Sequence, residues 1–188
     1  MNKILTFTIL SVMGFASMTA QKVTFGAKIG GNYAMVTGDN SSNYDPRTSI
    51  VIGAMAELTW IEGIAFQPEL IFSTQGFTSD EFDLKIKYVN IPLMGKYYVT
   101  KNFSIEAGPQ VGFRMLAIAD TPLGEYDAEK NIKKIDLGVN AGIGYKLESG
   151  VTFGARYNHG FSNINSYVGE KVSNKNAVVQ VTVGYFFF

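Results

Sequence analysis

His159 and Ser162 are the residues whose types could support nucleophilic catalysis. A histidine can act as a general base toward a serine hydroxyl when the two side chains lie within hydrogen-bond reach. They stand three apart in RYNHGFSNI, and successive side chains of a strand point to opposite faces. We therefore predict that they form no catalytic pair and that the protein is not an enzyme. His159 is the only histidine, which disfavours a histidine metal site, and we expect no cofactor.

A second group with possible chemistry consists of charged residues that share one parity within their segments. Five are basic and four are acidic: Lys28, Lys96, Arg114, Lys146 and Arg156, with Glu57, Glu69, Glu106 and Asp136. Unpaired buried charge is costly, so nearly balanced signs favour a closed, salt-bridged network. A polar conduit is the alternative interpretation. We predict that Lys96 and Glu106 are partners, because stepping back from a tight turn at Val99 and Phe103 places them opposite each other.

The elements that carry these residues are predicted to be strands, because hydrophobicity repeats with period two. In residues 23–35 the odd positions are mostly apolar, and the even positions are polar or small. Comparable alternation marks seven further segments: 50–60, 64–77, 88–99, 103–115, 135–147, 151–161 and 178–187. No amphipathic helix of convincing length interrupts them. The sequence therefore predicts an all-β chain with eight strands.

The connections between these segments alternate between short and long. Three short loops, Ile61-Glu62-Gly63, Thr100-Lys101-Asn102 and Glu148-Ser149-Gly150, end in Gly or Asn. These residue types tolerate the left-handed conformation that a three-residue hairpin needs at its last position. The other connections are long and polar. Tight turns at one end and long loops at the other are typical of outer-membrane barrels, with the short turns in the periplasm.

The apolar parity is predicted to face lipid. Aromatic residues flank an aliphatic band, as they do where barrels meet the membrane interfaces. The girdle beside the short turns comprises Phe25, Trp60, Tyr97, Phe103, Tyr145, Phe153 and Tyr185. Only a closed barrel satisfies every backbone group in lipid. We therefore predict an eight-stranded antiparallel up-and-down transmembrane β-barrel. A soluble lipocalin-like barrel with an apolar cavity is the alternative.

The two ends of the chain suggest export and membrane insertion. Residues 1–20 run from a basic start through an apolar stretch to small residues, the order of a signal peptide. Cleavage after Ala20 is the first interpretation and cleavage after Ala16 the alternative, which leaves residues 21–188 as the barrel domain. The aromatic end, with Tyr185, Phe187 and Phe188, resembles the signal that barrel proteins present to the insertion machinery. The sequence has no cysteine and a net charge of +0, and no basic stripe suggests nucleic acid.

Seven stretches together resemble one family. They are FGAKIGGNYAMVTG, FQPELIFSTQGF, YVNIPLMGKYYV, FSIEAGPQVGF, IDLGVNAGIGYKL, RYNHGFSNI and GYFFF, in that order. They look like the PorT-like outer-membrane β-barrel proteins, the porin family of Bacteroidetes-type Gram-negative bacteria. The resemblance covers nearly all of the mature chain and implies an outer-membrane location. For PorT itself it implies a link to a secretion and gliding apparatus.

The protein is predicted to function in the outer membrane. We expect an integral barrel with a structural role, or with a ligand-binding or partner-binding role through its external loops. Its interior is expected to be plugged, since side chains fill an eight-stranded barrel. The alternatives are a narrow channel, a barrel associated with a secretion apparatus and, with less support, a lipid-modifying enzyme. The expected partners are outer-membrane lipid, the insertion machinery and an unidentified surface or secretion partner.

Overall fold

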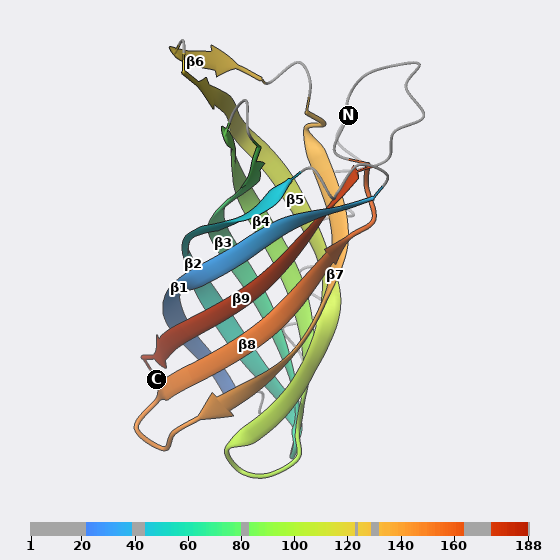
Figure 1. Ribbon diagram of the computed structural model, residues 1–188. Coiled ribbons are helices and arrows are strands. Elements are labelled where there is room, and N and C mark those ends of the chain that lie inside the picture. The colour runs from blue at the N-terminus through green and yellow to red at the C-terminus, as the bar shows by residue number, and fades with distance from the viewer. Residues whose placement is uncertain are drawn as a thin grey trace, which may run out of the picture.

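The computed structural model describes residues 22–38, 44–79, 83–122, 124–128, 132–163 and 174–187 (Figure 1). The predicted signal peptide and Phe188 lie outside these residues. Nine strands occur in the described part of the chain: β1 (Lys22–Gly38), β2 (Asp45–Ile61), β3 (Ile64–Thr78), β4 (Asp83–Tyr98), β5 (Phe103–Thr121), β6 (Gly124–Asp127), β7 (Ile135–Lys146), β8 (Val151–Gly160) and β9 (Asn174–Phe186).

Eight of these strands form a closed antiparallel ring. The order around the sheet is β4-β3-β2-β1-β9-β8-β7-β5, and a further pairing of β4 with β5 closes it. β1 and β9 join the two ends of the chain, in register from Gly26 opposite Phe186 to Gly38 opposite Asn174. Closure leaves no unpaired strand edge inside the membrane. The predicted eight-stranded antiparallel barrel is therefore confirmed.

The three tight turns lie at one end of the barrel, at the bottom of Figure 1. Gly63 (φ +82°) and Gly150 (φ +91°) adopt the left-handed conformation expected for the last loop position. The Val99 backbone amide donates a hydrogen bond to the Phe103 carbonyl, as the predicted register requires. The first turn is tighter than expected, because Ile61 opposes Ile64 and β2 bulges between Thr59 and Ile61.

At the opposite end the strands run farther than predicted. β4 begins at Asp83 rather than at position 88, and β5 continues to Thr121 rather than ending at position 115. Part of the expected 117–134 loop is the short strand β6, which pairs with β5 outside the ring. In these extensions one face of the hairpin is buried, with Leu84, Ile86 and Ala117 pointing inward, and the other face carries polar residues such as Lys85 and Lys87.

Polar and charged side chains are buried inside the barrel and large apolar side chains are exposed outside it, the reverse of a soluble protein. Glu57 is 2% exposed inside the barrel, whereas Trp60 is 56% exposed outside it. The lumen-facing side is tightly packed, and glycine allows strands to approach long side chains. A Cβ built on Gly30 would lie 2.0 Å from the Val181 carbonyl oxygen, which is backbone and cannot move aside.

Gly30→Ala is therefore expected to lower the free energy of unfolding by roughly 1–3 kcal/mol, the usual cost of overpacking. Gly31→Ala is the matched control on the adjacent, outward position. Its Cβ would meet only the Ser49 carbonyl at 3.8 Å, an ordinary contact. Urea unfolding of the two variants side by side measures the difference. Equal stabilities would contradict the close packing assigned to the inner face.

Candidate functional site

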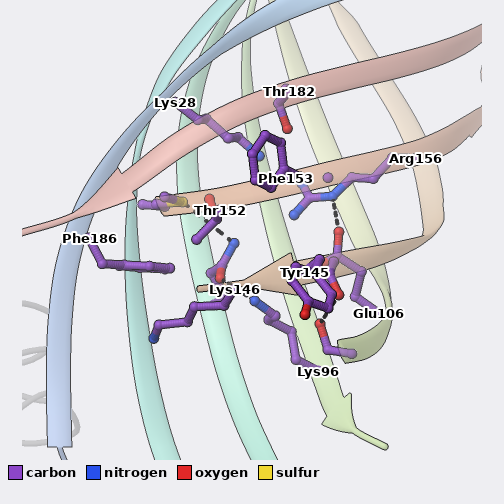
Figure 2. A pocket seen from close by; sticks show the side chains of 15 residues that line it. Lys28, Lys96, Glu106, Tyr145, Lys146, Thr152, Phe153, Arg156, Thr182 and Phe186 are labelled. Atoms are coloured by element: carbon purple, nitrogen blue, oxygen red, sulfur yellow. Dashed lines mark hydrogen bonds and ion pairs between the residues drawn. The ribbon is translucent and has the colours of Figure 1, made fainter. Parts of the chain in front are cut away.

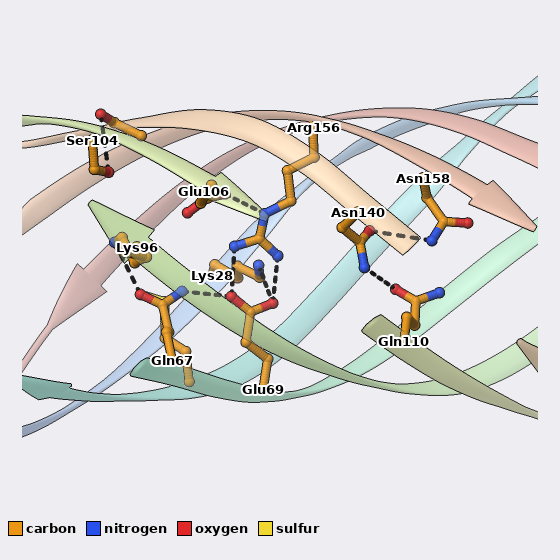
Figure 3. Close-up of polar contacts among 12 residues, drawn as sticks. Lys28, Gln67, Glu69, Lys96, Ser104, Glu106, Gln110, Asn140, Arg156 and Asn158 are labelled. Atoms are coloured by element: carbon orange, nitrogen blue, oxygen red, sulfur yellow. Dashed lines mark hydrogen bonds and ion pairs between the residues drawn. The ribbon is translucent and has the colours of Figure 1, made fainter. Parts of the chain in front are cut away.

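Two clusters of buried charge fill the lumen near the tight turns, and Figure 3 shows the first of them together with Gln67 and Lys96. The first centres on Arg156 of β8. Its Nη1 and Nη2 donate to the two carboxylate oxygens of Glu69 at 2.6 and 2.7 Å, and its Nε donates to Glu106. Lys28 Nζ adds a third donor to Glu69 at 2.6 Å. Bidentate guanidinium–carboxylate pairing fixes geometry strongly, so this cluster ties β1, β3, β5 and β8 together across the lumen.

The second cluster centres on Glu57 of β2, closer to the turns. Its carboxylate accepts from Lys96 Nζ at 2.9 Å, Lys146 Nζ at 2.8 Å and the Tyr98 hydroxyl at 2.7 Å. Gln67 joins the two clusters, because its carbonyl accepts from Lys96 at 3.0 Å and its amide donates to Glu69. The result is one continuous hydrogen-bonded network.

The predicted partnership of Lys96 with Glu106 is correct in register but wrong as an ion pair. The two residues are opposite each other on β4 and β5. Lys96 nevertheless pairs with Glu57, and Glu106 pairs with Arg156. Inside a narrow closed barrel, a long side chain reaches strands that are not its neighbours, so facing positions do not determine the partner.

Seven of the nine predicted lumen charges belong to this network, and the other two lie elsewhere. The seven are Lys28, Glu57, Glu69, Lys96, Glu106, Lys146 and Arg156. Asp136 lies nearer the long loops and accepts from the Asn176 amide at 2.7 Å. Arg114 is at the same end of the barrel, opposite Tyr88.

A belt of neutral polar side chains lies between the charged network and the loop end. Asn158 donates to Asn140, and Asn140 donates to Gln110, both at 3.2 Å. On the other wall, Asn32 donates to the Ser73 hydroxyl at 2.9 Å and accepts from Gln180 at 3.0 Å. Amide groups both donate and accept, so this belt fills the middle of the lumen without further charge.

An apolar cluster that was not predicted from the sequence fills the loop end of the barrel. Its buried members are Val36, Phe77, Leu84, Ile86, Tyr88, Ala117, Ala128 and Ile132. Tyr44 packs against it, with its ring centroid 4.1 Å from that of Phe77. The available signal was the alternation Leu84-Lys85-Ile86-Lys87-Tyr88, in which the apolar residues occupy even positions. In Val89-Asn90-Ile91 they occupy odd positions, so the two sets of apolar residues lie on opposite faces of the strand. The prediction began this strand at Tyr88 and so missed the change.

The outer face carries the predicted aromatic girdle. Trp60, Tyr97, Phe25 and Tyr185 are exposed, as are Tyr145 and Phe153, and Phe103 is partly exposed. Phe187 also points outward and packs edge-on against Tyr185, with the ring centroids 5.6 Å apart. This surface combines aliphatic residues with aromatic residues at its turn end, as lipid-facing barrel surfaces do.

His159 and Ser162 are engaged separately. The imidazole lies between the rings of Tyr157 and Phe161, with centroids 6.2 and 5.6 Å away. The Ser162 hydroxyl accepts the Leu137 backbone amide at 3.0 Å. Within the described residues, no group of three or more His, Cys, Asp or Glu side chains is placed to hold a metal ion.

Closed strands, a filled polar lumen and an apolar outer surface define a transmembrane β-barrel of the outer-membrane type. The chain belongs to the outer membrane protein beta-barrel domain family, whose model matches residues 16–166. It is thus an outer-membrane β-barrel protein.

Solved structures show the same fold at low sequence identity. Neisserial surface protein A is 13% identical, with a TM-score of 0.60, over 88% of this chain and 99% of that one. Ail, the attachment invasion locus protein of Yersinia pestis, is 15% identical with a TM-score of 0.55 over the same shares. A comparison with curated proteins found no match.

Proposed function

We propose that this protein is a plugged outer-membrane barrel that holds a binding surface outside the cell. The filled lumen carries the proposal, because a charged network, an amide belt and an apolar cluster follow one another along the barrel axis. Such an interior suits a rigid support better than a pore. The extended hairpins and β6 would then be the parts that meet a ligand or partner. Ail, named for attachment, is similar in fold only.

Planar-bilayer recording of the purified barrel tests the plug. We expect no steady open conductance, because the ion-paired side chains block the lumen. The emission of Trp60, the only tryptophan, reports membrane insertion in the same preparation, since its side chain faces outward. A stable, ion-selective conductance from inserted protein would favour the narrow channel. That second candidate draws some support from a hollow of about 530 Å³ at the turn-end mouth.

The orientation we propose places both termini and the tight turns in the periplasm. The described chain ends at Lys22 and Phe187 lie at the same end as those turns. An epitope tag within residues 117–134 should therefore be digested by protease added to whole cells. The same tag at Glu148-Ser149-Gly150 should be protected until the outer membrane is opened. The reverse digestion pattern would invert the orientation.

Biogenesis and partners complete the proposal. The outward Tyr185 and Phe187, followed by Phe188, would present the aromatic terminal signal to the insertion machinery. The resemblance to PorT-like proteins suggests a secretion apparatus as one source of a partner, alongside a surface ligand. Crosslinking in intact outer membrane followed by pull-down separates the two, because the tight-turn mouth would capture periplasmic proteins and the extended hairpins would capture surface components.

A further inference from the structure

A small cavity lies inside the charged network (Figure 2). Its volume is about 30 Å³, enough for one or two water-sized particles. Of the residues that the structure describes, four cationic side chains line it, Lys28, Lys96, Lys146 and Arg156, and Glu106 is the only carboxylate among them. The side chains that line the cavity therefore carry a net positive charge.

The surrounding network has more positive than negative charge. Its two clusters contain those four cations and three carboxylates, Glu57, Glu69 and Glu106. Four minus three leaves a net charge of +1. The excess arises where Lys96 and Lys146 share Glu57. Lys96 is buried and Lys146 is partly exposed, and a small anion in this cavity would be attracted by the excess positive charge.

Unused hydrogen-bond donors point to the same ligand. An ammonium group has three donors, and among the described residues Lys28 Nζ has a single hydrogen-bond acceptor, Glu69. The Lys28 side chain is only 4% exposed, so bulk water does not satisfy the remaining donors. The hydroxyl-bearing Thr182 also lines the cavity. The site therefore offers positive charge together with buried donors.

We infer that the cavity is a binding site for a single halide-sized anion, chloride under ordinary conditions. The small volume favours a compact anion over a bulky one such as gluconate. Access is from the turn-end mouth, because Phe186 and Lys146 line both this cavity and the larger hollow outside it. Phe186 is 4% exposed, and Lys146 Nζ lies 4.3 Å from its ring centroid, so these two side chains form the partition between the two spaces.

Anomalous diffraction from crystals soaked in sodium bromide tests the site directly. We expect a bromide peak within hydrogen-bond distance of Lys28 Nζ. In parallel, urea unfolding of the full folded barrel is measured in sodium chloride and in sodium gluconate at equal ionic strength. The midpoint should rise with chloride and reach a plateau, and it should not rise with gluconate. Density for water alone, without an anomalous peak, or equal midpoints in the two salts, would overturn the inference.

Variants separate this site from general salt effects. Lys28→Met should weaken the apparent chloride affinity at least tenfold. Lys101→Gln is the matched control, because Lys101 lines the outer hollow and not the inner cavity, and it should keep the wild-type dependence. If Lys28→Met does not fold, Thr182→Val replaces it and should reduce the affinity several-fold. Unchanged chloride dependence in the cavity variant would overturn the assignment.

Discussion

Glu69→Gln is expected to lower the free energy of unfolding by roughly 3–5 kcal/mol, the usual cost of removing one partner from a buried ion pair. Glu69 accepts from both Lys28 and Arg156. The nearly isosteric amide leaves the ammonium group without a carboxylate and reduces the guanidinium to one acidic partner, Glu106. Urea unfolding followed by Trp60 fluorescence measures the loss.

A double-mutant cycle identifies the cause of that loss. Adding Lys28→Met to Glu69→Gln removes the stranded charge and should restore part of the stability. The matched control is Asp120→Asn, which breaks the partly exposed pair between Lys85 and Asp120 at 2.9 Å and should cost no more than about 1 kcal/mol. If Glu69→Gln costs as little as Asp120→Asn, water reaches the lumen and the interior is not sealed.

Val139→Arg is expected to destabilise the folded barrel by roughly 2–4 kcal/mol, the cost of a cation on the lipid face near the bilayer midplane. Val139 lies mid-strand in β7 with its side chain outward, paired with Pro109 and His159 on the neighbouring strands. Folding into phosphatidylcholine vesicles at increasing urea concentrations gives the difference in free energy.

The control for this substitution is the same change at a different depth. Val99 is also outward but lies in the tight turn after β4, where a cation reaches water. Val99→Arg should cost roughly 0–1 kcal/mol, as charges do near the interface. Equal effects at the two positions would show that the outer face is not embedded in lipid, and the soluble barrel would again be the better interpretation.

Local rules in the sequence were sufficient for the ring of strands. Side-chain alternation predicted which residues face inward, and the three tight turns, ending in Gly or Asn, predicted the register of neighbouring strands. Both rules act between residues that are adjacent in the chain or across one hairpin. They placed Lys96 opposite Glu106 correctly.

Contacts between side chains across the lumen could not be predicted from alternation and turn residues. Arg156 reaches Glu69 on the far wall because the barrel closes and is narrow, and this geometry exists only after all the strands have paired. The apolar cluster was missed for a different reason. Its inward residues Leu84 and Ile86 lie among charged neighbours, where a search for lipid-facing alternation finds the wrong phase.

The inward-facing apolar residues at the loop end of β4 limit the height of the lipid-facing band. Outward-facing apolar residues on β4 run from Val89 to Tyr97. Before Val89 the apolar residues, Tyr88 and Ile86, point into the barrel instead. At about 3.3 Å per residue and a tilt of about 40°, this outward band is roughly 20 Å tall. Such a short belt matches a thin membrane, and the bacterial outer membrane is thinner than most. In a thicker bilayer the lipid would have to compress around the barrel, so hydrophobic mismatch alone would disfavour insertion in the wrong membrane.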